Sequence, residues 1–350
     1  MIALLCGMIQ RLFFALIPIF LLACGNTKSD DDHLITLKGE AQGTTFTIKY
    51  IDTLDRDLGP KVDSLLRAVD ASLSLWVDNS TVARFNAATD TFITADPHFH
   101  TMVALSHELW QRTGGAFDPT VLPLVRAWGL GRKSEAELDT MAVAGLMAAV
   151  GMDKLLMLDD GPRMPQQPTR YVKRDPRLQF DPNGIAQGYT VDLLAIMLEQ
   201  HGIQDHMVEV GGEVAARGFN PRGASWVIQI DKPVEGAEHQ RQALVALRDR
   251  SLATSGNYRK FIEVGGMRYG HTIDPRTGRP AMNRLLSATV VADACADADA
   301  LATALLVMGP DEARHWLAAE PSYDAYLIMD DGAGGYEVWR TPDWPGEEEM

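Results

Sequence analysis

The order in which helix-like and strand-like segments follow one another constrains the fold of this chain more than any other feature of its sequence. Helices and strands do not alternate regularly, as they would in a doubly wound parallel sheet. The sequence therefore predicts an α+β fold with mixed, largely antiparallel sheets flanked by helices. Apolar spacing predicts helices over 61–73, 97–113, 141–149, 185–200 and 295–308. It predicts strands within 34–50, at 155–158, 170–180, 206–210, 225–230, 243–247, 260–264, 268–273 and 286–292, and a last strand pair near the C-terminus.

The N-terminal segment is predicted to lie outside the folded domain. After Arg11, about a dozen apolar residues lead to a Leu-Leu-Ala-Cys run ending at Cys24, which resembles a secretory signal with a bacterial lipobox. The alternative, a buried helix ending at a free cysteine, lacks an amphipathic pattern. The chain can start at Met1 or at Met8. We expect a signal peptide at 1–23, the lipidated Cys24 with a tether to residue 33, one domain at 34–343 and an acidic tail at 344–350.

Cysteine content and charge exclude several kinds of site and partner. Beyond Cys24 the chain has a single cysteine, Cys295, so the domain can form neither an internal disulfide nor a thiolate zinc site, and we expect Cys295 to be buried. The 32 Lys and Arg residues against 47 Asp and Glu residues give a formal net charge of −15 at pH 7. This sign of charge disfavours nucleic acid as a partner. An anionic ligand would need local donors or a divalent cation.

The segment from Asp181 to Asp192 is a candidate ligand-binding loop. Gly184 lies where a helix is expected to begin, and Gly188 lies within its first turns. A helix N-terminus attracts anions, and a glycine there lets a ligand approach the backbone. Two alternatives remain open, namely that Gly188 serves close helix packing and that Asp181 is an N-cap. Similar loops rich in Gly, Asp and small polar residues occur at 43–45, 114–119, 210–213, 254–258 and 269–278.

Asp299 and Thr303 are candidate metal ligands on the last predicted helix. They are four residues apart and therefore share one face of an otherwise apolar helix. A carboxylate and a hydroxyl there are costly to bury without a partner, and their oxygens suit Mg²⁺. The alternative is that the acidic residues only complement the helix dipole. That alternative accounts for Asp297 but not for Thr303.

Histidines are the remaining candidates for chemistry. His271 is expected at the end of a strand beside a glycine-rich loop, where a histidine can act as a general base or be purely structural. His98, His100 and His107 crowd one helix without the spacing of a metal site, and we expect them at the surface.

Taken together and in this order, the motifs resemble those of the ApbE family of FAD:protein FMN transferases. The resemblance covers nearly the whole chain after the tether. It rests on residues 43–45, 72–76 with 84–86, 114–118, 181–192, 210–213, 253–258, 271–278 and 298–304.

This resemblance implies the family's fold, related to the T-fold, with an active site in a cleft between subdomains. It implies Mg²⁺ bridging the diphosphate of FAD, with ligands at the Gly184 carbonyl, Asp299 and Thr303. His271 matches the histidine taken to deprotonate a Thr or Ser hydroxyl of a target protein, which then attacks the FMN phosphorus and displaces AMP. The implied FAD contacts are Gln42, Leu75, Trp76, Val77, Ala116, Phe117, Asp118, Asp181, Gln187 and Ile273.

The resemblance also implies a partner and a location. The acceptor would be an exported redox protein, for example a subunit of a sodium-pumping quinone reductase or a related electron-transfer complex. The chain would be a bacterial lipoprotein facing the periplasm, with the inner membrane favoured over the outer.

Three positions depart from the family pattern. Gln42 replaces the usual methionine, Ala302 replaces an aspartate found in some relatives, and Gln187 stands where relatives often have lysine or glutamate. Three alternative functions follow from the same residues: an FAD pyrophosphatase with water as acceptor, a flavin-binding lipoprotein without turnover, and a hydrolase using Ser255, His271 and Asp274. The hydrolase lacks a Gly-x-Ser-x-Gly motif at Ser255.

Overall fold

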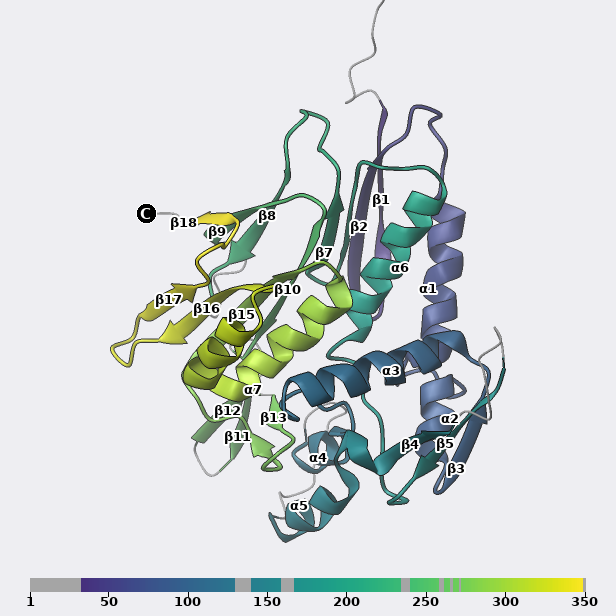
Figure 1. The fold of residues 1–350 in the computed structure, drawn as a ribbon, viewed down its shortest axis with the longest axis vertical. Helices are drawn as coiled ribbons and strands as arrows, with labels where there is room; N and C mark the ends of the chain where they lie inside the picture. The colour runs from purple at the N-terminus through teal and green to yellow at the C-terminus, as the bar shows by residue number, and fades with distance from the viewer. Residues whose placement is uncertain are drawn as a thin grey trace, which may run out of the picture.

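The centre of the molecule is an eight-stranded, wholly antiparallel sheet, which confirms the predicted α+β class (Figure 1). The computed structural model describes residues 33–129, 140–158, 167–233, 240–257, 261–264, 267–270 and 272–348. The predicted signal peptide and most of the tether, including Cys24, lie outside the described residues. In spatial order the sheet contains β1 (Leu34–Ala41), β2 (Thr44–Ile51), β6 (His206–Val210), β7 (Glu213–Arg217), β10 (Arg250–Gly256), β15 (Leu285–Ala292), β16 (Asp324–Asp330) and β17 (Tyr336–Arg340).

Helices cover one face of this sheet and a small second sheet covers the other. The helical layer contains α6 (Ala186–Gln200) and α7 (Cys295–Ala319), with α1 (Gly59–Leu73) beside α6 (Figure 1). The opposite face packs Val214 and Ala216 against Trp226 and Val245. The second sheet has the order β18-β9-β8, from β8 (Trp226–Asp231), β9 (Arg241–Leu247) and β18 (Gly346–Glu348).

A smaller unit lies below the large sheet in the view of Figure 1. Its aromatic core places the ring of Phe85 5.1 Å from that of Phe99 and 6.4 Å from that of Phe180. It is built from α2 (Thr81–Ala87), α3 (Pro97–Arg112), α4 (Leu122–Ala127), α5 (Thr140–Leu146) and the sheet β3-β5-β4, formed by β3 (Thr91–Thr94), β4 (Leu155–Leu158) and β5 (Thr169–Lys173). Two hairpins pair β11 (Phe261–Val264) with β12 (Met267–Gly270) and β13 (Ile273–Asp274) with β14 (Arg279–Pro280).

Most predicted segments form the expected elements, and the differences have local causes. The strand expected over 170–180 ends at Lys173, because Asp175 and Arg177 form a turn there. The short helix α4 follows the predicted loop at 114–119 and was not among the predicted helices. The expected acidic tail contributes β18, which pairs with β9, and Trp344 is buried. Cys295 is buried, as predicted, and forms no disulfide with any of the described residues.

The last helix continues beyond its predicted end at residue 308 through a kink. Gly309 adopts φ 74° and ψ 175°, and Pro310 follows it inside the helix. Because proline has no N–H, the Leu306 carbonyl lacks its usual helical partner. The Asn283 side chain donates to that carbonyl at 2.8 Å instead. The kink is therefore supported from outside the helix.

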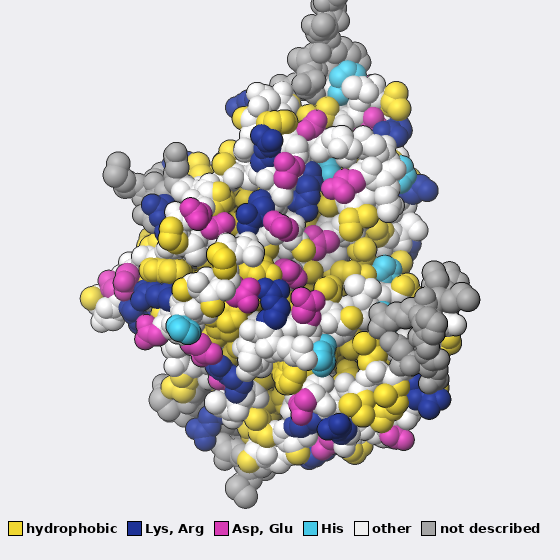
Figure 2. Space-filling view, in the orientation of Figure 1, with side chains coloured by type: hydrophobic (Ala, Val, Ile, Leu, Met, Phe, Trp, Pro, Cys, Tyr) yellow, Lys and Arg dark blue, Asp and Glu magenta, His cyan; other side chains and the backbone are white. Residues whose placement is uncertain are grey.

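On the face of the molecule shown in Figure 2, basic and acidic side chains are interspersed. In the described part of the chain, no helix has the length and apolar character needed to cross a membrane.

The helices α6 and α7 approach each other very closely at Gly188. A Cβ atom on Gly188 would lie 2.7 Å from the carbonyl carbon of Cys295 and 2.8 Å from the Cβ of Asp299. Real Cβ atoms do not come this close to backbone atoms, so a larger residue would push the helices apart. The packing interpretation of Gly188 is therefore confirmed.

We predict that Gly188→Ala lowers the free energy of unfolding by about 1–3 kcal/mol because of this overlap. The matched control is Gly145→Ala in α5, where a Cβ would meet nothing within 4 Å. That control should be neutral or stabilising by up to about 1 kcal/mol, since alanine favours helix. Denaturant unfolding measures both, and equal effects of the two substitutions would contradict the packing argument.

We further predict an acid-sensitive contribution from His206, which is fully buried at the start of β6. Burial, assisted by the charge of Arg217, lowers the pKa of His206 to about 4. As pH falls from about 6.5 towards 4, the unfolded chain takes up a proton that the folded chain refuses, so this contribution to stability is lost. Relative to wild type, His206→Gln should therefore gain up to about 3 kcal/mol in unfolding free energy between pH 7 and pH 4.

The control for this measurement is His315→Gln, at an exposed histidine on α7. Its unfolding free energy should follow that of wild type over the same pH range. If the difference between His206→Gln and wild type stays constant with pH, the buried neutral imidazole does not contribute as described.

Candidate active site

Three predicted site residues from distant parts of the chain meet beside the start of α6. A Cβ atom placed on Gly184 would lie 3.5 Å from Cε2 of Phe117 and 3.6 Å from Oγ1 of Thr303. The Gly184 backbone thus faces the Thr303 hydroxyl, with the Phe117 ring beside them. All three are predicted site residues, and the structure brings them together.

Asp299 lies one helical turn before Thr303 and is only 5% exposed. Its Oδ2 atom accepts a hydrogen bond from the Gly188 backbone N–H at 3.0 Å. Burial raises the pKa of Asp299 to about 7, the Gly188 hydrogen bond opposes this, and the nearby charge of Asp192 adds to it. The tight α6–α7 contact therefore directly orients the carboxylate.

Thr303 has a second neighbour in Ser255, which lies in the predicted loop 254–258 and was also considered as part of a hydrolase site. The Ser255 hydroxyl on β10 lies 3.0 Å from the Thr303 hydroxyl. In the proposed hydrolase the acid would be Asp274, but its carboxylate accepts hydrogen bonds from the Nε and backbone N–H of Arg276. Ser255 therefore lies beside Gly184, Asp299 and Thr303, which together form the oxygen cluster of the candidate site.

Glu213 is a further acidic group near this cluster that was not assigned a role. It begins β7, is 6% exposed, and its Oε2 atom has no hydrogen-bond partner among the described residues. Burial first, and then the charge of Asp299, raise the pKa of Glu213 well above its ordinary value. The sequence signal was Glu213 at the end of the Val-Gly-Gly-Glu motif, which carries no role by itself.

The donor set fits a hard divalent cation. A backbone carbonyl, a carboxylate and a hydroxyl offer oxygen atoms only, and Mg²⁺ typically takes one or two protein carboxylates together with substrate phosphate. Within the described ranges, no group of three or more His, Cys, Asp or Glu side chains has a metal-binding arrangement.

Asp192 fixes the beginning of α7, where the ligand-bearing turns start. Its two carboxylate oxygens accept the backbone N–H groups of Cys295 at 2.8 Å and Ala296 at 2.9 Å. These N–H groups have no partner within the helix, so a carboxylate from α6 stabilises the α7 N-terminus. Burial raises the pKa of Asp192 to about 6.

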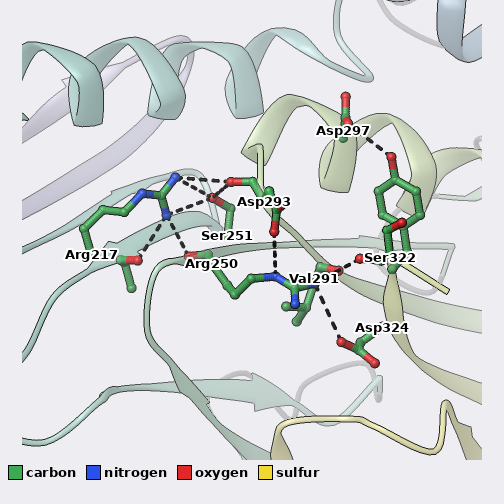
Figure 3. Close-up of polar contacts among 10 residues, drawn as sticks. Arg217, Arg250, Ser251, Val291, Asp293, Asp297, Ser322 and Asp324 are labelled. Atoms are coloured by element: carbon green, nitrogen blue, oxygen red, sulfur yellow. Dashed lines mark hydrogen bonds and ion pairs between the residues drawn. The ribbon is translucent and has the colours of Figure 1, made fainter.

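Two arginines hold the turn between β15 and α7 (Figure 3). Arg217 donates to the Asp293 carbonyl at 3.2 Å and to the Arg250 carbonyl at 3.1 Å. Arg250 donates to the Val291 carbonyl at 3.1 Å and pairs with the Asp293 carboxylate at 3.2 Å. This network ties the start of α7 to the sheet.

Among the implied flavin contacts, Ala116, Phe117 and Asp118 are buried. Asp118 accepts hydrogen bonds from the backbone N–H of Thr120 at 2.8 Å and of Met152 at 3.3 Å. Burial raises the pKa of Asp118 to about 6. Its carboxylate therefore already holds the loop together, and its contact with a flavin stays a prediction.

Gln42 and Gln187 both lie near the first turns of α6. Gln42 adopts φ 53° in the β1–β2 turn and donates from Nε2 to the Thr190 hydroxyl at 2.7 Å. The Gln42 Oε1 atom is buried and has no partner among the described residues. The amide of Gln187 lies against Gly211 in the β6–β7 turn. Gln42 thus contacts α6 through Thr190, and Gln187 belongs to the first turn of the same helix.

Asp181 does not cap α6, contrary to one of the alternatives. The N-cap residue is Ile185, whereas Asp181 accepts the backbone N–H of Asn183 at 3.0 Å within the preceding loop. The loop makes its own turn before the helix begins. Burial raises the pKa of Asp181.

The other predicted residues are more scattered. Trp76 and Val77 are 62% and 42% exposed, and Leu75 is half-buried. Ile273 is buried among Leu124, Val143 and Val150. His271 lies outside the described residues, although the Thr272 hydroxyl beside it donates to Asn257 at 2.7 Å.

The histidines of α3 are not the surface residues that we expected. His98 and His100 are half-buried, because the Tyr189 and Tyr171 hydroxyls lie within hydrogen-bond distance of their Nδ1 atoms, at 2.9 Å and 3.1 Å. His107 is half-buried against Trp110.

Comparison with known proteins gives consistent matches in sequence and structure. Residues 42–327 match the model of the ApbE family. The chain is 35% identical to a FAD:protein FMN transferase of Haemophilus influenzae, over 85% of this chain and 86% of that protein. It is 33% identical to the FAD:protein FMN transferase of Escherichia coli K12, over 90% and 89%.

A solved structure has the same fold over most of the chain. The flavin transferase ApbE from Vibrio cholerae superposes with a TM-score of 0.77 at 32% identity, covering 88% of this chain and 97% of that one. The eight-stranded sheet, the α6–α7 layer and the oxygen cluster around Gly184 thus occur in a chain that belongs to the ApbE family.

Proposed function

We propose that this protein transfers FMN from FAD to a Thr or Ser hydroxyl of another protein, forms a phosphoester bond and releases AMP. The observation that carries the proposal is the convergence of Gly184, Thr303 and Asp299 at the start of α6, in a chain of the ApbE family. Its relatives are named FAD:protein FMN transferases.

The residues of the oxygen cluster would hold Mg²⁺ through the Gly184 carbonyl, the Asp299 carboxylate and the Thr303 hydroxyl. When bound, this cation would neutralise the diphosphate of FAD and stabilise charge on the transferring phosphate. The chain is acidic overall, with a formal net charge of −15. A cation therefore explains how it accepts an anionic substrate.

His271 would take the proton of the acceptor hydroxyl at a ring nitrogen. The acceptor oxygen forms a bond to the FMN phosphorus, and the bond from that phosphorus to the bridging oxygen of AMP breaks. AMP leaves with the bridging oxygen and its electron pair. Atoms and charge balance without a further reactant.

The acceptor and the location are part of the same proposal. We infer an exported redox protein as acceptor, for example a subunit of a sodium-pumping quinone reductase or a related electron-transfer complex. Lipidation at Cys24 would anchor the enzyme at the membrane, facing the periplasm. The lipobox-like run before Cys24 supports this.

The direct test incubates the protein with FAD, MgCl₂ and a Thr-containing acceptor domain. We predict an acceptor mass increase equal to FMN and an equal amount of AMP, measured by mass spectrometry and chromatography. His271→Ala should still bind FAD but should transfer about 10²–10⁴-fold more slowly, since it lacks the base. FAD fluorescence measures binding separately.

Each other result of this test has a defined meaning. AMP release without an acceptor adduct would identify an FAD pyrophosphatase. FAD binding with neither product would leave a flavin carrier. Loss of FAD binding in His271→Ala would contradict its role as a base.

A second prediction concerns Asp299. Asp299→Asn removes the carboxylate charge but keeps the shape, so the Mg²⁺ concentration for half-maximal transfer should rise at least tenfold. The matched control is Asp297→Asn on the same helix. Asp297 accepts a hydrogen bond from the Tyr323 hydroxyl at 3.2 Å (Figure 3), so this control should give the magnesium titration of wild type. Identical magnesium titrations of Asp299→Asn and wild type would refute the ligand role.

A further inference from the structure

The strand β7 alternates between the two cores, and this alternation sets the direction of Glu213. Val214 and Ala216 lie in the core shared with the small sheet, whereas Ala215 lies in the core with Cys295 and α6. Because successive strand residues point to opposite faces, Glu213 shares the face of Ala215. Its carboxylate therefore points into the layer covered by α6 and α7.

Contacts between α7 and the sheet place Glu213 beneath Asp299. The Cys295 thiol lies 3.6 Å from the Val214 carbonyl and 3.8 Å from the Leu252 carbonyl. Two turns later on α7, Thr303 contacts Ser255, which lies three residues after Leu252 on β10.

Asp299 lies between these two contacts on the helix. One step from Cys295 to Asp299 covers about 6 Å along a helix, and the step from Ala215 to Glu213 covers about 6.7 Å along a strand. The two carboxylates are therefore neighbours across the interface between helix and sheet.

Neither carboxylate is neutralised by a basic side chain in the described part of the structure. Among the described ion pairs, none involves Glu213 or Asp299, and the Glu213 Oε2 atom is buried without a hydrogen-bond partner. The β6–β7 turn does not need Glu213, because the Gly212 N–H donates to Glu209 instead, at 3.0 Å. Two buried carboxylates close together repel unless a cation or a proton lies between them.

We propose that Glu213 is a second carboxylate of the divalent-cation site, facing Asp299 from β7. This inference rests on the proposed function for the cation itself, but it adds a residue from a different element. Glu213 would supply a second carboxylate ligand beside that of Asp299, and the remaining ligands of the cation would come from the diphosphate of FAD. This role would explain why a Glu213 oxygen is buried without a hydrogen-bond partner among the described residues.

The test uses Mn²⁺ as a probe of the site in the full-length protein with FAD present. Free Mn²⁺ is measured by electron paramagnetic resonance, and competition with Mg²⁺ shows that both ions share the site. Glu213→Gln should weaken Mn²⁺ binding about 10–100-fold. The matched control is Glu209→Gln, on the neighbouring strand β6 but on the opposite face from Val208 and Val210. It should bind Mn²⁺ as wild type does.

A thermal measurement in EDTA separates the cation role from a structural one. Without a divalent ion, Glu213→Gln removes a repulsive buried charge, so its Tm should equal or exceed that of wild type. It should also lose most of the Tm increase that MnCl₂ and FAD give to wild type. Glu213→Asp, which keeps the charge on a shorter side chain, should recover part of the Mn²⁺ affinity.

The outcomes distinguish this inference from the proposed function. If wild type binds Mn²⁺ and Glu213→Gln binds it equally well, the role of Glu213 is wrong and the proposed function is untouched. A lower Tm of Glu213→Gln in EDTA with unchanged Mn²⁺ affinity would make Glu213 purely structural. If wild type itself binds no Mn²⁺ in the presence of FAD, both ideas fail.

Discussion

The contact between α6 and α7 at Gly188 is the constraint on which the rest of the site depends. A side chain at this position would overlap the backbone of Cys295, so only glycine lets the two helices pack this closely. The same N–H group that glycine exposes there binds the Asp299 carboxylate. One residue thus sets both the helix spacing and the orientation of a ligand. Gly184, four residues earlier, faces Thr303 because that spacing is fixed.

The fold contains several buried carboxylates, and each has its own explanation. Asp192 stabilises the first N–H groups of α7, and Asp118 holds the loop that contains Thr120. The carboxylates of Asp299 and Glu213 have fewer hydrogen-bond partners, and burial raises the pKa of both. Burying a charge without a partner costs free energy, so these two groups are where a cation has most to stabilise. The arginine network around Asp293 keeps the turn before α7 in place while this charge is accommodated.

Sequence patterns predicted those helices and strands that are determined by the spacing of residues within the segment itself. Apolar periodicity gave the helices near 185–200 and 295–308, and the spacing of Asp299 and Thr303 placed both on one face of a helix. The polar partners that come from other elements were not predictable in this way. Ser255 meets Thr303 only through the pairing of β10 with its neighbours, and Glu213 is a single polar residue whose direction depends on strand register. The strand β18 has an acidic sequence and forms because β9 offers an edge.

The most direct test of this account is the position of the cation in crystals grown with FAD and MnCl₂. Anomalous diffraction locates Mn²⁺ without reference to activity. The account predicts a single strong peak bounded by the Gly184 carbonyl, the Thr303 hydroxyl and the Asp299 carboxylate, at the α6–α7 contact. A peak elsewhere, with FAD bound and these three groups free of the ion, would contradict the claim that this helix contact assembles the cation site.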